Sequence, residues 1–159
     1  MTPSKPEVST GSTFETLKVP PQNPAAGATG EIKEFLAANR YFTVVLDDDP
    51  TGSQAVHGID VVLIPEASEV VQALREGSGS CFVLTNTRSL TEDEAIELTS
   101  ALVENILEML RDDDVVVRFV SRSDSTLRGH VIAEIAVIEK AQIRSSGKGF
   151  QAILFAPAF

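Results

Sequence analysis

The chain has 159 residues, with 13 basic against 23 acidic side chains and a formal net charge of −10. Hydrophobic residues make up 43% of the sequence, which is typical of a globular domain with its own core. The acidic balance disfavours general binding of nucleic acids or anionic membranes, because both require a basic surface. No apolar run approaches the roughly 20 residues of a spanning helix, and no signal peptide opens the sequence. We therefore expect a cytoplasmic protein.

Residues 1–30 are rich in Pro, Ser, Thr and Gly, and they predict a flexible amino-terminal arm. Residues 31–39 favour a short helix. Beyond it, apolar runs predict strands at 42–45, 59–64, 81–84, 115–120 and 152–155, with amphipathic helices after the second, third and fourth of them. This alternation predicts an α/β fold, a three-layer sandwich with a mostly parallel sheet of about five strands and helices on both faces. The single cysteine, Cys81, lies in an apolar run and is interpreted as a core residue.

Local signals place two helix starts. Thr91 and Glu94 form the capping-box pattern T-x-x-E, which predicts a helix that begins after residue 91. Asp124 or Ser125 is expected to cap the helix that follows the fourth strand. The acidic run 112–114 precedes a strand instead of following one, so we interpret it as solvated surface.

Three polar loops follow predicted strands. The first is Asp47-Asp48-Asp49-Pro50-Thr51-Gly52, the second is Thr85-Asn86-Thr87-Arg88, and the third is Ser121-Arg122-Ser123-Asp124-Ser125-Thr126. Three adjacent carboxylates repel one another and cost folding energy unless cations or donors compensate them. Because the carboxyl ends of parallel strands form the ligand-binding edge of such sheets, we expect the three loops to converge there.

The side chains of these loops suit a particular ligand class. Arginine forks bind carboxylate or phosphate bidentately. Carboxylates and hydroxyls can hydrogen-bond a polyhydroxylated molecule. A sugar acid satisfies both demands at once.

The motifs Asp-Asp-Pro-Thr-Gly, Leu-Thr-Asn-Thr-Arg-Ser-Leu and Ser-Arg-Ser-Asp-Ser-Thr-Leu-Arg-Gly-His resemble the amino-terminal half of the four-carbon acid sugar kinases. The resemblance runs from about Leu17 to Phe159. It implies an enzyme that phosphorylates sugar acids such as erythronate and threonate with ATP and Mg²⁺. It also implies that this half binds the sugar acid and that a separate carboxy-terminal domain binds most of the nucleotide.

The resemblance implies roles for individual positions. Asp48 would orient or deprotonate the attacking hydroxyl as the catalytic residue. One of the three arginines would hold the carboxylate of the substrate. The residues implied in substrate binding are Asp49, Thr51, Gly52, Arg88, Arg122, Asp124, Ser125, Thr126 and Arg128.

The chain departs from the family pattern at its end. The family continues past Pro157-Ala158-Phe159, so we expect residues 31–159 to be a domain incomplete at its C-terminal end, without the nucleotide-binding domain. The 159 residues contain neither G-x-x-x-x-G-K-[ST] nor G-x-G-x-x-G. We therefore expect no activity and no bound cofactor for this chain alone, and a small sugar acid as its ligand. A separate nucleotide-binding half or a second copy of the chain remains open as a partner.

Two other interpretations remain open. Asp47-x-Asp49-x-Thr51 also satisfies the DxDxT pattern of haloacid-dehalogenase-like phosphatases, with Asp47 as nucleophile, Asp49 as acid/base and Mg²⁺ between them. The other is a non-catalytic, ligand-binding fragment. His57 and His130 have no second His or Cys at ligand spacing, so the sequence itself predicts no metal site.

Overall fold

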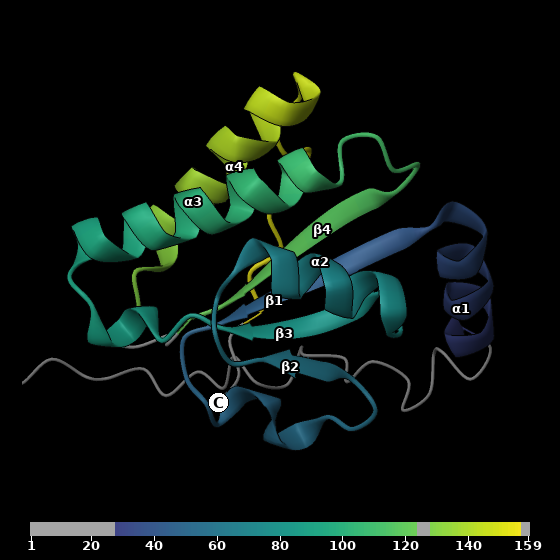
Figure 1. Cartoon of the computed structure of the whole chain (residues 1–159), viewed down its shortest axis with the longest axis horizontal. Helices are drawn as coiled ribbons and strands as arrows, with labels where there is room; N and C mark the ends of the chain where they lie inside the picture. The colour runs from purple at the N-terminus through teal and green to yellow at the C-terminus, as the bar shows by residue number, and fades with distance from the viewer. Residues whose placement is uncertain (1–27, 124–127, 157–159) are drawn as a thin grey trace, which may run out of the picture. The chain divides into compact units, whose positions relative to one another are not determined.

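The structure is a computed structural model that describes residues 28–123 and 128–156 (Figure 1). The chain forms two compact units, Met1–Phe35 and Leu36–Phe159. The division falls inside the first helix, α1 (Ala28–Asn39). Residues 1–27 of the predicted arm lie outside the described residues, and 28–30 belong to α1. Ile32 and Phe35 of α1 are 56% and 50% exposed.

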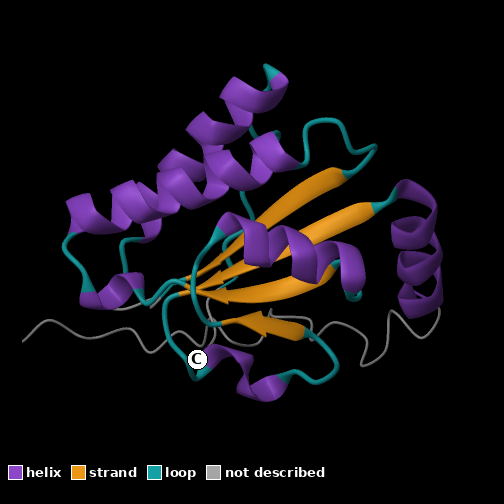
Figure 2. Ribbon diagram, in the orientation of Figure 1, coloured by secondary structure: helices purple, strands orange, loops and turns teal. Residues whose placement is uncertain are grey.

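The second unit is built on one parallel sheet. Its strands are β1 (Tyr41–Asp47), β2 (Asp60–Val62), β3 (Ser80–Leu84) and β4 (Val116–Arg122), in the order β2-β3-β1-β4 (Figure 2). All three neighbouring pairs are parallel. The predicted α/β class with a mostly parallel sheet is confirmed. Because β1 and β3 each have a neighbour on both sides, these two strands form the centre of the sheet.

The register divides the side chains of the sheet between two faces. Val44 of β1 lies beside Cys81 and Phe119, whereas the next residue, Val45, lies beside Phe82 and Val120. Successive strand residues point to opposite faces. The Val44 face is the buried one, because Val44 and Cys81 are both fully buried.

Three helices cover the Val44 face: α2 (Ala67–Glu76), α3 (Glu92–Met109) and α4 (Val131–Ser146). Figure 1 shows α3 and α4 side by side, with α2 across the sheet. One apolar cluster joins these helices to the strands, and its fully buried side chains include Val44, Val70, Cys81, Val83, Val103 and Ile106. None of the described helices is long and apolar enough to cross a membrane.

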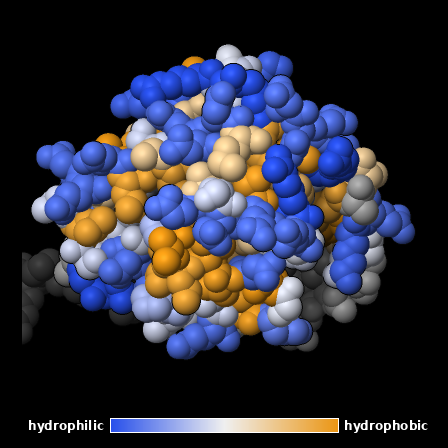
Figure 3. Space-filling model, viewed as in Figure 1, coloured by the Kyte–Doolittle hydropathy of each residue, from blue (hydrophilic) through white to orange (hydrophobic). Residues whose placement is uncertain are grey.

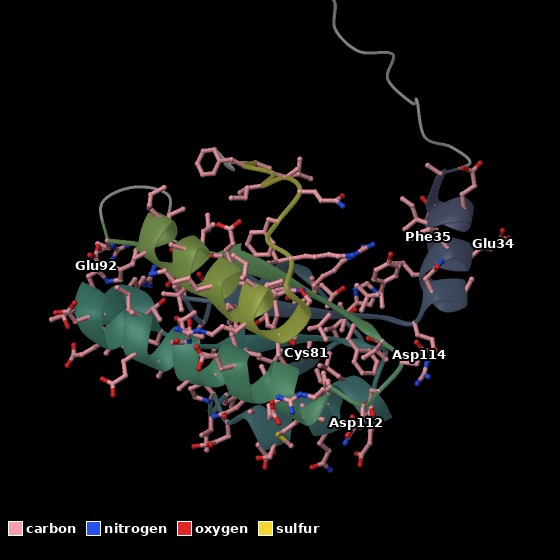
Figure 4. All side chains as sticks on the ribbon, turned by 90° about the horizontal axis from the view of Figure 1, so that it is seen from above. Glu34, Phe35, Cys81, Glu92, Asp112 and Asp114 are labelled. Carbon is pink, nitrogen blue, oxygen red and sulfur yellow. The ribbon has the colours of Figure 1, made fainter. Side chains whose placement is uncertain are left out.

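The structure confirms that Cys81 is a core residue. It lies in β3 among the side chains between sheet and helices (Figure 4), and it is a free thiol. Burial raises the pKa of the Cys81 thiol to about 11, with a smaller contribution from the charge of Asp60. Because the thiolate is the reactive form, this cysteine is chemically inert near neutral pH.

The opposite face of the sheet is only partly covered by the described residues. Val116 and Val120 of β4 are 49% and 46% exposed, and the 3₁₀ turn η2 (Gly52–Ala55) follows β1. At the edge of this face, the guanidinium of Arg118 lies 3.8 Å from the ring centroid of Tyr41. Figure 3 shows the other side of the molecule, which carries the helices, and there apolar patches lie among hydrophilic side chains.

The structure corrects several predictions about the strands. The run 152–155 is not a strand, because no neighbouring strand pairs with it in the described part of the chain; Leu154 is 94% exposed. The sheet therefore has four described strands instead of about five. The second strand is shorter than predicted, since Leu63 and Ile64 leave the ladder and are exposed.

The last helix also starts later than predicted. The residue at the N-cap position of α4 is His130, which is neither Asp124 nor Ser125. The segment 124–127 lies outside the described residues. The buried residues of α4 are Glu134, Val137, Ile138 and Ala141.

The capping box at α3 is confirmed and gives a direct stability test. The Thr91 side chain accepts from the backbone N–H of Glu94 at 3.4 Å, and the Glu94 carboxylate accepts from the backbone N–H of Thr91 at 2.9 Å. Thr91→Ala should lower the free energy of unfolding by about 1 kcal/mol in a urea titration, because the helix loses its cap. The matched control is Ser100→Ala within the same helix, which leaves the cap intact. Equal stability of Thr91→Ala and the wild type would contradict the prediction.

Candidate functional site

Three loops meet at the carboxyl ends of β1, β3 and β4. Asp47, the last residue of β1, lies in register with Leu84 and with Arg122, the last residues of its two neighbours. Backbone hydrogen bonds extend this alignment past the strand ends. The N–H of Thr85 donates to the carbonyl of Asp47 at 2.9 Å, and the N–H of Asp48 donates to the carbonyl of Arg122 at 3.3 Å. The parallel sheet thus brings the three polar loops to one edge, as the motif positions predict.

Asp47 is a buried carboxylate paired with arginine. Its side chain is 3% exposed, and its Oδ1 accepts from Nη1 of Arg122 at 3.1 Å. The backbone N–H of Asp49 also donates to Oδ1, at 3.4 Å. A buried carboxylate is costly unless a cation and hydrogen bonds compensate it. Arg122 is the compensating cation, and its side chain stays 49% exposed.

Asp49 forms the second ion pair of the site, with Nη1 of Arg88. Its Oδ1 also accepts the backbone N–H of Thr51 at 3.0 Å, which closes a short turn after β1. The pKa of Asp49 is lowered chiefly by this Thr51 N–H, then by the Thr51 side chain and by the charge of Arg88, while partial desolvation opposes the shift. Asp49 is therefore held as a carboxylate.

The second loop turns sharply to present Arg88. Asn86 adopts a left-handed backbone with φ 50°, which Asn tolerates better than most residues. The 3₁₀ turn η3 (Thr87–Ser89) follows it, and the side chain of Asn86 donates to Ser89 Oγ at 2.9 Å. Thr87 is 1% exposed, while Arg88 points back to the first loop.

The predicted catalytic residue Asp48 is 3% exposed. It lies between two carboxylates that engage arginines, and its own backbone is tied to β4. Thr51 and Arg128 are exposed, and Arg128 stands in the turn before α4. The predicted residues Asp124, Ser125 and Thr126 lie outside the described residues.

Gly52 has a steric role that the sequence motif did not explain. A Cβ at this position would lie 1.9 Å from Asp47 Oδ2 and 2.0 Å from Arg122 Nη1. Such distances are well inside van der Waals contact, so no larger residue fits while the ion pair is in place. The glycine of the first loop therefore lets the backbone approach the buried pair.

Sequence reasoning missed two residues of the site. Asp47 received a role of its own only in the phosphatase interpretation, although it is the most buried carboxylate of the first loop. Glu134 was not singled out at all, yet it is 4% exposed and accepts from Thr87 and Ser121. The sequence signal that could have identified Glu134 is its spacing. It lies four residues before the buried Ile138, on an otherwise apolar stripe of α4.

The acidic run 112–114 does not belong to this edge. The predicted solvated run 112–114 contains two exposed residues, and Asp113 pairs with Arg75 at 2.9 Å. In Figure 4, Asp112 and Asp114 lie at the opposite end of α3 from Glu92. Within the described residues, no group of three or more His, Cys, Asp or Glu side chains is placed to hold a metal ion. The phosphatase interpretation, with Mg²⁺ between Asp47 and Asp49, stays a prediction.

One known protein family matches the chain. The family described as "Sugar-binding N-terminal domain" matches residues 43–159, which is more than half of the chain and spans all three loops. The chain belongs to this family of sugar-binding domains. No curated protein and no solved structure matches it.

Substitution of Gly52 tests the packing at the end of β1. Gly52→Ala should displace the Asp47 carboxylate from Arg122, because the new methyl group overlaps both partners. Overpacking of this kind costs about 1–3 kcal/mol, which a urea titration would measure. Gly58→Ala is the control for glycine replacement. The Cβ position of Gly58 has open space around it, so this variant adds no steric overlap, although the φ of 69° adds backbone strain. A Gly52→Ala protein as stable as the wild type would contradict the geometry.

The lowered pKa of Asp49 predicts that the stability of the folded chain depends on pH. Because its pKa is lower in the folded chain, the stabilisation is present above its ordinary pKa and is lost as the pH falls through the folded value. Thr51→Val, which keeps the N–H but removes the hydroxyl, should raise the pKa only partly. Arg88→Gln should also raise it partly. Carboxyl-carbon NMR titration of Asp49 measures both changes, and a full return to the ordinary pKa in either variant would contradict the ranking of causes.

Proposed function

We propose that this chain is the amino-terminal, sugar-acid-binding part of an ATP-dependent kinase that phosphorylates four-carbon sugar acids of the erythronate and threonate type. Membership in a sugar-binding family supports a small sugar ligand. The observation that carries the acid part of the proposal is the pair of guanidinium groups, Arg88 and Arg122, at the carboxyl edge of the sheet.

Arg122 has donors to offer a ligand. A guanidinium carries five N–H donors, and the described contact with Asp47 engages Nη1. The side chain of Arg122 is also half exposed, so a ligand can reach it. A substrate carboxylate would add to this pair as a second anion, in the geometry that favours bidentate binding. Arg128, exposed in the turn before α4, would supply further positive charge.

The carboxylates would act on the hydroxyl groups of the ligand. Asp49 is held ionised, and its side chain is more accessible than that of its neighbour Asp48. In the proposed reaction Asp48 orients or deprotonates the attacking hydroxyl, and Asp49 accepts a hydrogen bond from the sugar acid. A kinase gains most of its rate by aligning the γ-phosphoryl group with the acceptor and neutralising its charge. In this proposal ATP and Mg²⁺ are bound mainly by a separate nucleotide-binding half, and the 159-residue chain alone does not turn over ATP.

Calorimetric titration with erythronate and threonate tests the binding proposal. Arg128→Ala should weaken binding by about 1.5–3 kcal/mol, because a charge-assisted contact is lost. Arg128 is chosen because Arg122 also compensates the buried Asp47, so its removal would perturb the fold. Arg111→Ala is the matched control, since Arg111 lies exposed beyond the end of α3 and pairs with Glu108. Equal affinities of the Arg128→Ala and Arg111→Ala proteins would contradict the proposed site.

Turnover of ATP tests whether the nucleotide is bound mainly by a separate half. With ATP, Mg²⁺ and either sugar acid present, the chain should release no ADP above the background. Tight ATP binding, or ADP release that depends on the sugar acid, would show that the 159 residues supply the nucleotide site themselves.

A further inference from the structure

Glu134 links the two loops that carry the arginines of the site. It lies on α4 and is 4% exposed. Its Oε1 accepts the hydroxyl of Thr87 at 2.6 Å, and its Oε2 accepts the hydroxyl of Ser121 at 2.9 Å. Thr87 belongs to η3 after strand β3, and Ser121 belongs to β4. One carboxylate therefore ties α4 to two separate loops of the sheet edge.

Each of the two hydroxyl residues directly precedes an arginine of the site. Ser121 points to the helix face of the sheet, so its neighbour Arg122 points to the opposite face, where it meets Asp47. Thr87 is buried, and its neighbour Arg88 points to Asp49. When the hydroxyls of Thr87 and Ser121 are held, the backbone next to them is held as well. The side chains of Arg88 and Arg122 therefore leave the backbone in fixed directions.

The hydrogen-bond network reaches the first loop as well. Thr85 Oγ1 lies 3.5 Å from Thr87 Oγ1 and donates to the carbonyl of Asp47 at 3.1 Å. Each hydroxyl has a single proton to give. Thr87 and Ser121 give theirs to Glu134, and Thr85 gives its own to Asp47. The two carboxyl oxygens of Glu134 thus each accept from one hydroxyl.

A buried carboxylate is an expensive way to fill a core position that an apolar side chain could fill. A satisfied polar network can instead select one arrangement of the groups that it joins. We propose that Glu134 is a positioning residue for the sugar-acid site: it acts through Thr87 and Ser121 to hold Arg88 and Arg122 in place. The ligand-binding part of this inference rests on the proposed function, whereas the ordering of the arginines does not.

Glu134→Gln tests the inference, because the amide keeps the size of the side chain but replaces one acceptor oxygen with a donor. The control is Glu139→Gln, the same substitution five residues along α4, where the carboxylate accepts from the backbone of Phe150. Two measurements are made on folded protein. One is the order of the Arg88 and Arg122 side chains, from ¹⁵N relaxation at Nε without ligand. The other is the affinity for erythronate by calorimetry.

In Glu134→Gln, both arginines should become more mobile and the affinity should fall about tenfold or more. Glu139→Gln should change neither quantity. A folded Glu134→Gln protein with unchanged arginine order would overturn the inference, whatever its stability. Failure of the wild type to bind either acid would refute the proposed function, while the arginine measurement would still decide the role of Glu134.

A second pair of variants decides the matter where Glu134→Gln does not fold. Thr87→Val removes the hydroxyl and keeps the shape, so it should loosen Arg88. Thr87→Ser keeps the hydroxyl and should preserve the order of Arg88. The same Arg88 relaxation in both variants would overturn the inference.

Discussion

The ion pair between Asp47 and Arg122 is the constraint on which the edge of the sheet depends. A carboxylate that is 3% exposed at the end of the central strand requires a cation, and β4 supplies it because its last residue lies in register with the last residue of β1. Gly52 is required for the same reason, since its backbone passes through the space that a Cβ would take from the pair. The geometry of the first loop follows from this one compensated charge.

The second pair, between Asp49 and Arg88, has a different character. It is partly exposed, and solvent screening makes such pairs worth little for stability. Its effect is on charge state and placement: Asp49 remains ionised, and Arg88 is drawn toward the first loop. The edge of the sheet therefore combines a pair with a buried carboxylate, Asp47–Arg122, and a partly exposed pair, Asp49–Arg88. Under the proposed function, a sugar acid would contact the exposed side of Arg122 while its pair with the buried Asp47 stays intact.

Much of this arrangement could be predicted from local patterns. The apolar runs located the four strands, and the T-x-x-E pattern located the start of α3, because both signals arise from neighbouring residues. The run 152–155 has the composition of a strand but no partner strand in the described part of the chain, and pairing is not encoded locally. The start of α4 was also predicted wrongly from a local cap signal, since His130 takes the N-cap position in place of Asp124 or Ser125.

The site was predicted less completely than the fold. Strand ends indicated where Asp48, Asp49, Arg88 and Arg122 would lie. Which carboxylate is compensated by which arginine depends on register across β1 and β4, and the importance of Glu134 depends on contacts with residues 47 and 13 positions away. No pattern along the chain reports such long-range contacts.

The most direct test of the central claim is a backbone amide NMR titration with erythronate, with the uncharged alcohol erythritol as the matched ligand. We predict that erythronate shifts the amides of the three loops, around Asp49, Arg88 and Arg122, and that erythritol has a much smaller effect. Erythronate shifts centred on the opposite end of the sheet, around Asp113, or equal effects of the two ligands, would contradict the account.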